Sequence, residues 1–337
     1  MQGSGLLPAA DKEDALKTAS PPLTASRKSR ISDQVAAFVI KTSAYATIAS
    51  LILIFIFIGK QALPVLTSAS VRQEAGLTKL FLAQPDEDGV KTYAWQPMSD
   101  PTPKYSLWPL LVGTLKVTLI AVLAAIPLAV GAALFTSEFA PGYIREVLKP
   151  AIELLAGIPS VVIGFFCLML LADWLQSIFG WTFRLNATTA GLGLSLAVIP
   201  IVYTVAEDAF TSVPQTFRAG SLAMGASTWQ TAWRVVLPAA SPGVLAACVL
   251  GFGRAIGETM IVLIASGNAS IISFSPTDSI RTFSATIAAE LGEVVVGSPH
   301  YHVLFFIGAF LFILTFLTNL AGQWWVGRLQ KKLQGVV

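Results

Sequence analysis

An arginine and a glutamate, Arg254 and Glu258, are the only charged residues in the apolar run from residue 243 to 267. A charge at the centre of a bilayer costs between about 3 and 15 kcal/mol, so two such residues need a reason. Four positions apart, they lie on one face of a continuous helix and can form an ion pair. Pairing lowers the cost of burying either charge. A guanidinium group is also a planar fork that fits the oxygens of an oxyanion.

Two interpretations of this pair stay open on the residues alone. In the structural one, the pair joins its helix to a neighbouring helix. In the functional one, Arg254 lies on an anion path, and Glu258 keeps the site neutral while no anion is present. An anion would compete with Glu258 for Arg254 and bind weakly, as a path requires. Lys116 is a weaker candidate for the same path, because its side chain could instead extend outward to the membrane surface.

The rest of the sequence offers little chemistry for catalysis. It contains no G-x-x-x-x-G-K-[ST] motif for nucleotide phosphates and no metal-binding spacing. The only histidines, His300 and His302, precede the last apolar stretch and are expected at the membrane interface rather than on a metal. The two cysteines, Cys167 and Cys248, lie inside apolar stretches and are typical of packing residues. We therefore expect no catalytic residue, no metal site and no cofactor in this chain.

The composition is that of an integral membrane protein. Hydrophobic residues make up 54% of the chain and charged residues 12%, whereas a soluble domain carries about 25% charge. A helix needs about 20 mostly apolar residues to span a bilayer. Six stretches meet this requirement, at residues 35–58, 108–135, 151–172, 188–206, 241–265 and 303–326. These observations predict an all-α integral membrane protein with six transmembrane helices, and the net charge of +3 does not suggest a nucleic-acid partner.

Lysine and arginine accumulate on one side of these six spans. They are frequent in "SRKSR" and "RLQKKL", next to the first and last spans, and this pattern places both chain ends in the cytoplasm. The first apolar stretch is too long for a signal peptide, so we expect it to be an uncleaved helix. The predicted parts are a cytosolic N-terminal tail at 1–34, a first helix at 35–58, an outer insert at 59–107, a core at 108–326 and a cytosolic C-terminal tail at 327–337.

Two outer segments are long enough to contain secondary structure. The insert at 59–107 is polar and could form a small hairpin or a cap, and the segment 266–302 could hold a short surface helix at about 282–291. We expect structured loops there without a role in ligand binding.

The cytoplasmic segment 207–240 is amphipathic but not apolar enough to span the membrane. Pro214 opens it, Gly225 lies in its middle and Pro238 closes it, which predicts a helix, a tight turn, a second helix and a return to the bilayer. Glycine suits a turn that needs a positive φ. The segment also has large apolar residues, which favour either a surface for another protein or a helix resting on lipid headgroups: Phe217, Met224, Trp229 and Trp233.

This segment resembles the cytoplasmic signature of ABC-importer permeases: Glu-Ala-Ala, three residues, Gly, nine residues, an aliphatic residue, any residue, Leu-Pro. The matching positions are Gly225, Val235, Leu237 and Pro238. The opening triplet differs, because its positions hold Ala219, Gly220 and Ser221. The family's glutamate, which helps to dock the segment on an ATPase subunit, is therefore missing. The resemblance implies that residues 217–238 couple the chain to an ATPase.

Three further stretches resemble the permeases of phosphate-specific ABC transporters. They are "GRAIGETM" (253–260), "ELLAGIPSVVIGFF" (153–166) and "GTLKVTLIAVLAAIPLAVGAALFTSEFAP" (113–141). The tail at 300–329 is more similar to the C subunit than to the A subunit. The resemblance covers about residues 108–330. It implies a type I (MetI-like) ABC importer permease core with one extra N-terminal helix, in the inner membrane of a bacterial cell.

The resemblance also implies the partners and the role of the chain. The partners would be a second permease subunit of the A type, two copies of an ATPase subunit that bind ATP and Mg, and an outer phosphate-binding protein. The substrate would be inorganic phosphate, and Arg254 and Glu258 would lie on its path. A permease for another oxyanion, such as sulfate or molybdate, is the nearer alternative. A secondary transporter driven by an ion gradient is the other, but the sequence shows no inverted repeat.

Overall fold

The computed structural model describes residues 27–85, 91–99, 103–333 and 335. It is predominantly helical, and six helices in the described part are long and apolar enough to cross a membrane. The chain divides into two compact units, residues 1–57 and 58–337. The described part of the first unit belongs to one helix, α2 (Arg27–Ala62). Its side chains are exposed throughout residues 32–57, as expected for a helix surrounded by lipid.

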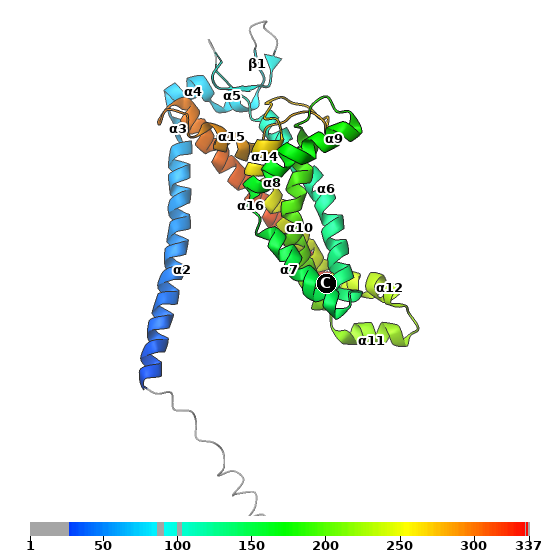
Figure 1. The fold of residues 1–337 in the computed structure, drawn as a ribbon. Helices are drawn as coiled ribbons and strands as arrows, with labels where there is room; N and C mark the ends of the chain where they lie inside the picture. The colour runs from blue at the N-terminus through cyan, green and yellow to red at the C-terminus, as the bar shows by residue number, and fades with distance from the viewer. Residues whose placement is uncertain (1–26, 86–90, 100–102, 334, 336–337) are drawn as a thin grey trace, which may run out of the picture. The chain divides into compact units, whose positions relative to one another are not determined.

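The second unit holds the outer insert and the remaining spans. At its two ends lie different elements: the insert with α3 to α5, and the cytoplasmic segment with α11 and α12 (Figure 1). The insert contains three short helices and two antiparallel hairpins, in which β1 pairs with β2 and β3 with β4. Its elements are α3 (Pro64–Thr67), α4 (Ala69–Ala75), α5 (Leu77–Phe81), β1 (Gln84–Pro85), β2 (Lys91–Thr92), β3 (Trp95–Gln96) and β4 (Lys104–Tyr105).

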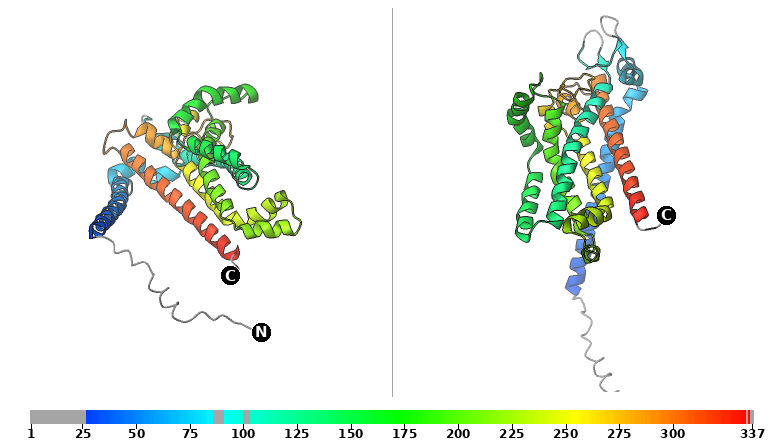
Figure 2. Two further views of the ribbon diagram at one scale, coloured as in Figure 1. Left: turned by 60° about the horizontal axis from the view of Figure 1, so that its bottom comes forward. Right: turned by 90° about the vertical axis from the view of Figure 1, so that its right-hand side faces the viewer.

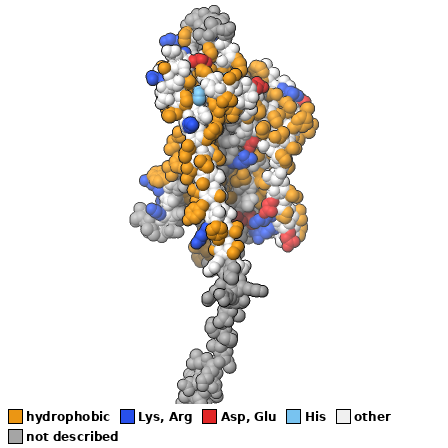
Figure 3. Space-filling view, turned by 90° about the vertical axis from the view of Figure 1, so that its left-hand side faces the viewer, with side chains coloured by type: hydrophobic (Ala, Val, Ile, Leu, Met, Phe, Trp, Pro, Cys, Tyr) orange, Lys and Arg blue, Asp and Glu red, His pale blue; other side chains and the backbone are white. Residues whose placement is uncertain are grey.

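The helices after the insert form the body of the second unit, and α6, α13 and α16 run side by side in the right-hand view of Figure 2. On the face drawn in Figure 3, hydrophobic side chains make up most of the surface. The remaining elements are α6 (Trp108–Glu138), α7 (Gly142–Ala156), α8 (Ser160–Phe166), the π-turn η1 (Cys167–Leu171), α9 (Ala172–Phe179), α10 (Ala187–Thr211), α11 (Gln215–Ala223), α12 (Thr228–Thr231), the π-turn η2 (Ala232–Val236), α13 (Leu237–Ile256), α14 (Met260–Ala265), α15 (Phe283–Glu290) and α16 (Pro299–Leu333).

Small residues bring the central helices close together. Helix α6 packs on α10 with a row of fully buried alanines at every fourth position, from Ala121 to Ala133. Glycines do the same from the other side: a Cβ added at Gly191 would lie 2.6 Å from Cγ2 of Ile120. Between α10 and α13, a Cβ added at Gly251 would lie 2.5 Å from Val202. Such close backbones supply the van der Waals contact that holds helices together in lipid, where the hydrophobic effect gives little.

The predicted spans agree with the structure at four positions and differ at two. The spans at 35–58, 108–135, 188–206 and 303–326 are confirmed and extend as α2, α6, α10 and α16. The span at 151–172 is wrong, because α7 ends at Ala156 and the spanning helix runs from Ser160 to Phe179. Proline at 159 disfavours a helical residue before it and offers no N–H, so the helix breaks there.

The fifth span begins earlier and ends earlier than predicted. One helical stretch runs from Thr228 to Ile256 instead of 241–265. Pro238 does not close the cytoplasmic segment, because it lies within this stretch, as the second residue of α13 after the π-turn η2. A π-turn loosens the hydrogen-bond ladder locally, which lets the helix accommodate a proline that has no N–H to donate.

The outer segments are also more ordered than expected. The predicted helix at 282–291 is confirmed as α15, but it is buried against α6, α14 and α16 instead of lying on the surface. The insert shares a core with the start of α6, with α15 and with the adjoining end of α16, and Trp95 and Tyr105 are buried in it. The prediction of a hairpin is confirmed.

Enlarging Gly191 tests the close packing of α6 on α10. Gly191→Leu should lower the free energy of unfolding by about 1–3 kcal/mol, because Ile120 and the helix behind it must move. Gly131→Leu is the matched control, since a Cβ at Gly131 meets no atom within 4 Å. The measurement is unfolding of the purified chain in mixed micelles by increasing dodecyl sulfate. Equal stability of the two variants would contradict the packing argument.

Candidate functional site

The fifth span is interrupted next to Arg254. Helix α13 ends at Ile256 and α14 begins at Met260, so Glu258 lies in a non-helical break between them. The expectation that Arg254 and Glu258 share one face of a continuous helix is therefore wrong. Glycine at 257 is a poor helix former, yet the run of apolar residues continues on both sides and conceals the break in the sequence.

A serine from the outer helix stabilises this break. The hydroxyl of Ser284, in α15, donates a hydrogen bond of 2.7 Å to the backbone carbonyl of Glu258. Backbone outside a helix is tolerated at membrane depth only where protein or a water-filled cavity satisfies it. The buried position of α15 supplies that partner, so the loop between α14 and α16 holds the break open.

Arg254 and Glu258 nevertheless form the expected ion pair. Nη1 of Arg254 lies 2.9 Å from Oε2 of Glu258. The contact is an ion pair by distance, but Oε2 is buried and accepts no hydrogen bond from the described residues. The two partners differ sharply in exposure: the side chain of Glu258 is 3% exposed and that of Arg254 is 45% exposed. The guanidinium group therefore presents N–H donors to whatever covers this face.

Two other polar residues lie within the spans, Lys116 about two turns into α6 and Asn319 in α16. Lys116 does not join the pair: its ammonium donates a 2.8 Å hydrogen bond to the carbonyl of Ser275 in the outer loop, which favours the outward orientation. Asn319, in α16, packs against α13, because a Cβ added at Gly253 would lie 2.9 Å from its Oδ1. Asn319 was not among the residues predicted for the path, although an amide in an apolar stretch is a usable signal.

The cytoplasmic segment has the predicted helix, turn and helix. Gly225 has a φ of +84°, which L-residues with a side chain rarely adopt. The N–H of Ala226 bonds to the carbonyl of Ser221 and that of Gly225 to the carbonyl of Leu222, which is a Schellman motif. Helix α12 then starts with a capping box, in which Ser227 and Gln230 bond to each other's backbone N–H.

The segment presents an apolar surface on its outside. Trp229 and Trp233 stack with their ring centroids 6.0 Å apart, and Met224 is 88% exposed at the turn. Phe217 is exposed on α11. Large apolar groups gathered in this way are typical of a site for another protein.

The structure places the signature positions along this segment. Ala219 and Gly220 are exposed on α11, whereas Ser221 is partly buried and its hydroxyl lies 2.9 Å from that of Thr231. This contact holds α11 on α12. The last three positions of the signature, Val235, Leu237 and Pro238, lie where η2 joins α13. Val235 and Leu237 are partly buried, and Pro238 is exposed.

Comparison with known proteins identifies the family. A family model described as "Binding-protein-dependent transport system inner membrane component" matches residues 125–335. This chain belongs to that family. The permease is 34% identical to "Probable ABC transporter permease protein YqgH" of Bacillus subtilis (strain 168), over 88% of this chain and 92% of the relative. It is 35% identical to "Phosphate transport system permease protein PstC 1" of Mycobacterium tuberculosis (strain ATCC 25618 / H37Rv), over 67% of this chain and 74% of the relative.

Solved structures agree on the fold of the permease. A chain of a bacterial ABC transporter involved in the import of the acidic polysaccharide alginate has a TM-score of 0.59, with 15% identity, over 89% of this chain and 99% of that one. A chain of the MetNI methionine ABC transporter in an inward-facing conformation has a TM-score of 0.50, with 18% identity, over 66% of this chain and 94% of that one. The predicted type I (MetI-like) importer fold is confirmed.

The outer face of the permease is held together by one carboxylate. Glu290 accepts hydrogen bonds from Arg281 at 2.7 Å and from Nε1 of Trp95 at 3.1 Å, and it lies 2.9 Å from Nε2 of His300. These contacts tie the insert to the end of α15 and the start of α16. His300 is thus part of a buried polar cluster, and Tyr105 lies beside it, where burial and a hydrogen bond to a glutamate raise the pKa of the phenol.

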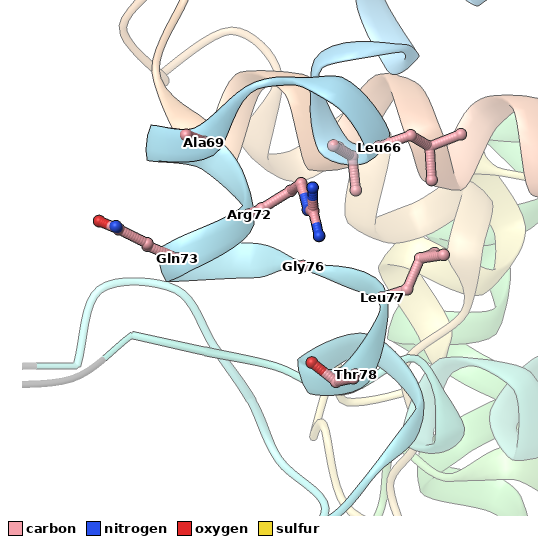
Figure 4. Close-up of a pocket in the computed structure, with 8 residues that line it drawn as sticks. Leu66, Ala69, Arg72, Gln73, Gly76, Leu77 and Thr78 are labelled. Carbon is pink, nitrogen blue, oxygen red and sulfur yellow. The ribbon is translucent and has the colours of Figure 1, made fainter.

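A separate cavity of about 650 Å³ lies within the insert itself. In Figure 4, Arg72 and Leu77 face the same opening, whereas Gln73 points away from it. Arg72 is the charged residue in its lining. The expectation that the insert has no role in ligand binding stays a prediction.

Removing the hydroxyl of Ser284 tests how the break is held. Ser284→Ala should lower the free energy of unfolding by about 1–3 kcal/mol, because the carbonyl of Glu258 loses its partner in a buried place. Ser241→Ala should cost less, because that exposed hydroxyl bonds only within its own helix. Dodecyl sulfate unfolding of the two purified variants measures both values, and equal losses would count against a special role for Ser284.

Proposed function

We propose that this permease is the C-type subunit of an ATP-driven importer of inorganic phosphate in the bacterial inner membrane. It would form the phosphate path together with a second permease subunit of the A type. The observation that carries the proposal is the exposed guanidinium group of Arg254 at an interrupted span, with its carboxylate partner buried behind it. The likeness to relatives described as phosphate transport system permease proteins supports phosphate as the substrate.

An exposed arginine within a span requires a polar neighbour. Lipid tails cannot solvate the side chain of Arg254, which is 45% exposed, without a large energetic cost. A second permease subunit facing it, with water between the two, removes that cost. The face that carries Arg254 would then line a path at the interface of the two permeases.

The pair with Glu258 suits transient binding of phosphate. Among the described residues, no hydrogen bond occupies the donors of Arg254. A phosphate can therefore make a bidentate contact with the guanidinium group from its exposed side. Glu258 offsets the positive charge when the path is empty and competes with the anion when it arrives. A site of this kind releases its ligand easily, whereas an unopposed arginine would retain it.

The exposed apolar side chains of residues 217–238 support an ATP-driven mechanism. We infer that residues 217–238 dock on an ATPase subunit, of which two copies bind ATP and Mg, and that this chain has no catalytic role. Phe217, Met224 and Trp229 offer apolar anchors in place of the family's missing glutamate at Ala219. Closure of the ATPase dimer would move these segments and open the path outward, where a phosphate-binding protein delivers the anion. We infer that both chain ends lie in the cytoplasm, because lysine and arginine accumulate on that side.

Replacing Arg254 tests the path directly. Arg254→Gln should abolish phosphate uptake by proteoliposomes that hold the whole importer, while the subunit stays in the complex. Arg184→Gln is the matched control. Arg184 lies in an outer loop, its side chain is similarly exposed, and it pairs with Asp173 of α9. Uptake of sulfate and molybdate by the wild type, measured in parallel, tests the alternative oxyanions. Normal phosphate uptake by Arg254→Gln would end the proposal for this residue.

Substitutions of Gly225 test the coupling turn. Gly225→Val should cost about 1–2 kcal/mol in the turn, since a β-branched residue does not tolerate the positive φ. It should lower uptake per ATP hydrolysed several-fold or prevent assembly with the ATPase. Gly225→Asn should stay close to the wild type, because asparagine tolerates this conformation. Full coupled transport by the valine variant would refute the docking role of the turn.

A further inference from the structure

One guanidinium group joins the coupling segment, residues 217–238, to the first core span. Arg218, in α11, and Glu138, the last residue of α6, are largely buried, with side chains 13% and 8% exposed. Nη2 of Arg218 lies 2.7 Å from Oε1 of Glu138, and Nε lies 3.0 Å from Oε2. This is the bidentate arrangement that fixes both position and orientation.

The remaining donors of Arg218 reach a third helix. Its Nη1 donates to the carbonyl of Val213, and its Nη2 also donates to the carbonyl of Phe210 at 2.8 Å. Phe210 lies in the last turn of α10 and Val213 lies two residues beyond its end, where backbone carbonyls have few partners within the helix. The carbonyl of Phe210 also accepts a hydrogen bond from the N–H of Val213. The side chain of Arg218 therefore binds α6, α10 and α11 at one point.

The end of α6 is itself held in place around Glu138. Arg145 donates to the carbonyls of Thr136 at 3.2 Å and Ser137 at 3.0 Å. The hydroxyl of Ser137 donates to Oε1 of Glu138 at 2.9 Å. Because α6 also packs tightly along α10, a displacement of α11 through Arg218 would move two spans as one body.

The coupling segment thus has two attachments to the membrane domain. On one side, α12 continues through η2 into α13, the helix that carries Arg254. On the other side, α11 follows α10 along the chain and is clamped to α6 by Arg218. Without the clamp, a pull on the segment would move α13 while α11 could swing on the short link of residues 212–214.

We propose that Arg218 and Glu138 are positioning residues that make α6 and α10 follow the coupling segment during the transport cycle. The inference rests on the proposed function, because it assumes that an ATPase drives this segment. The pair does not touch substrate or nucleotide. Its loss should therefore change how much transport each hydrolysed ATP produces, without changing the KM for phosphate.

The experiment uses the whole importer in proteoliposomes and compares Arg218→Gln, Glu138→Gln and Arg218→Lys with the wild type. Phosphate uptake and ATP hydrolysis are measured in the same vesicles. In the two glutamine variants, uptake per ATP should fall at least ten-fold, while hydrolysis stimulated by the binding protein stays within about three-fold of the wild type. Arg218→Lys keeps the charge but loses the bidentate contact. Its ratio of phosphate uptake to ATP hydrolysis should therefore fall by two-fold or more.

Lys149→Gln is the matched control for losing a cytoplasmic ion pair. Lys149 lies 2.9 Å from Oε2 of Glu207, and this hydrogen bond raises the pKa of the lysine. The pair joins α7 to α10 and does not involve the coupling segment. Uptake per ATP should therefore be unchanged in Lys149→Gln.

Each outcome decides the matter. An unchanged ratio in Arg218→Gln overturns the proposal, and so does a parallel fall of uptake and hydrolysis, which would indicate a docking defect. If the glutamine variants do not assemble, Arg218→Lys decides: a lowered ratio supports the clamp, and a wild-type ratio overturns it. Failure of the proposed function looks different, because the wild-type importer itself would then take up no phosphate.

Discussion

The cost of an incompletely solvated charge inside a bilayer is the constraint on which this structure depends. The burial cost of Arg254 within its span is lowered by Glu258 beside it, and its exposed side requires a polar neighbour. The break at residues 257–259 lets Glu258 approach from outside the helix. The break in turn needs α15, whose Ser284 satisfies the freed carbonyl. One charge therefore accounts for the pair, the break and the buried outer helix.

Much of the architecture follows from local patterns in the sequence. Apolar length predicted the spans at 108–135, 188–206 and 303–326, because hydrocarbon thickness leaves few alternatives. The turn at Gly225 was predictable because its signals are also local. The glycine marks the end of one helix, and Ser227 with Gln230 three residues later marks the start of the next by local hydrogen bonds. The exposure of the apolar residues around it also followed from their position outside the predicted spans.

The features missed from the sequence depend on contacts between distant residues. The break after Ile256 was not predicted, since Gly257 is tolerated inside helices and only the contact with Ser284 makes the break stable. The pair of Arg218 with Glu138 joins positions 80 residues apart, and many basic and acidic residues could have been matched equally well. The depth of α15 was missed because a short helix within a polar loop is usually placed at the surface.

The π-turn at residues 232–236 fixes an angular relation between the two ends of one helix. A π-turn takes one residue more than an α-helical turn, and one residue corresponds to about 100° of rotation but only about 1.5 Å of rise. The direction in which Arg254 projects, relative to the tryptophan pair on the cytoplasmic end, is therefore set by this turn. In such a helix, gaining or losing a single residue would leave the length nearly unchanged while turning the arginine toward a different neighbour.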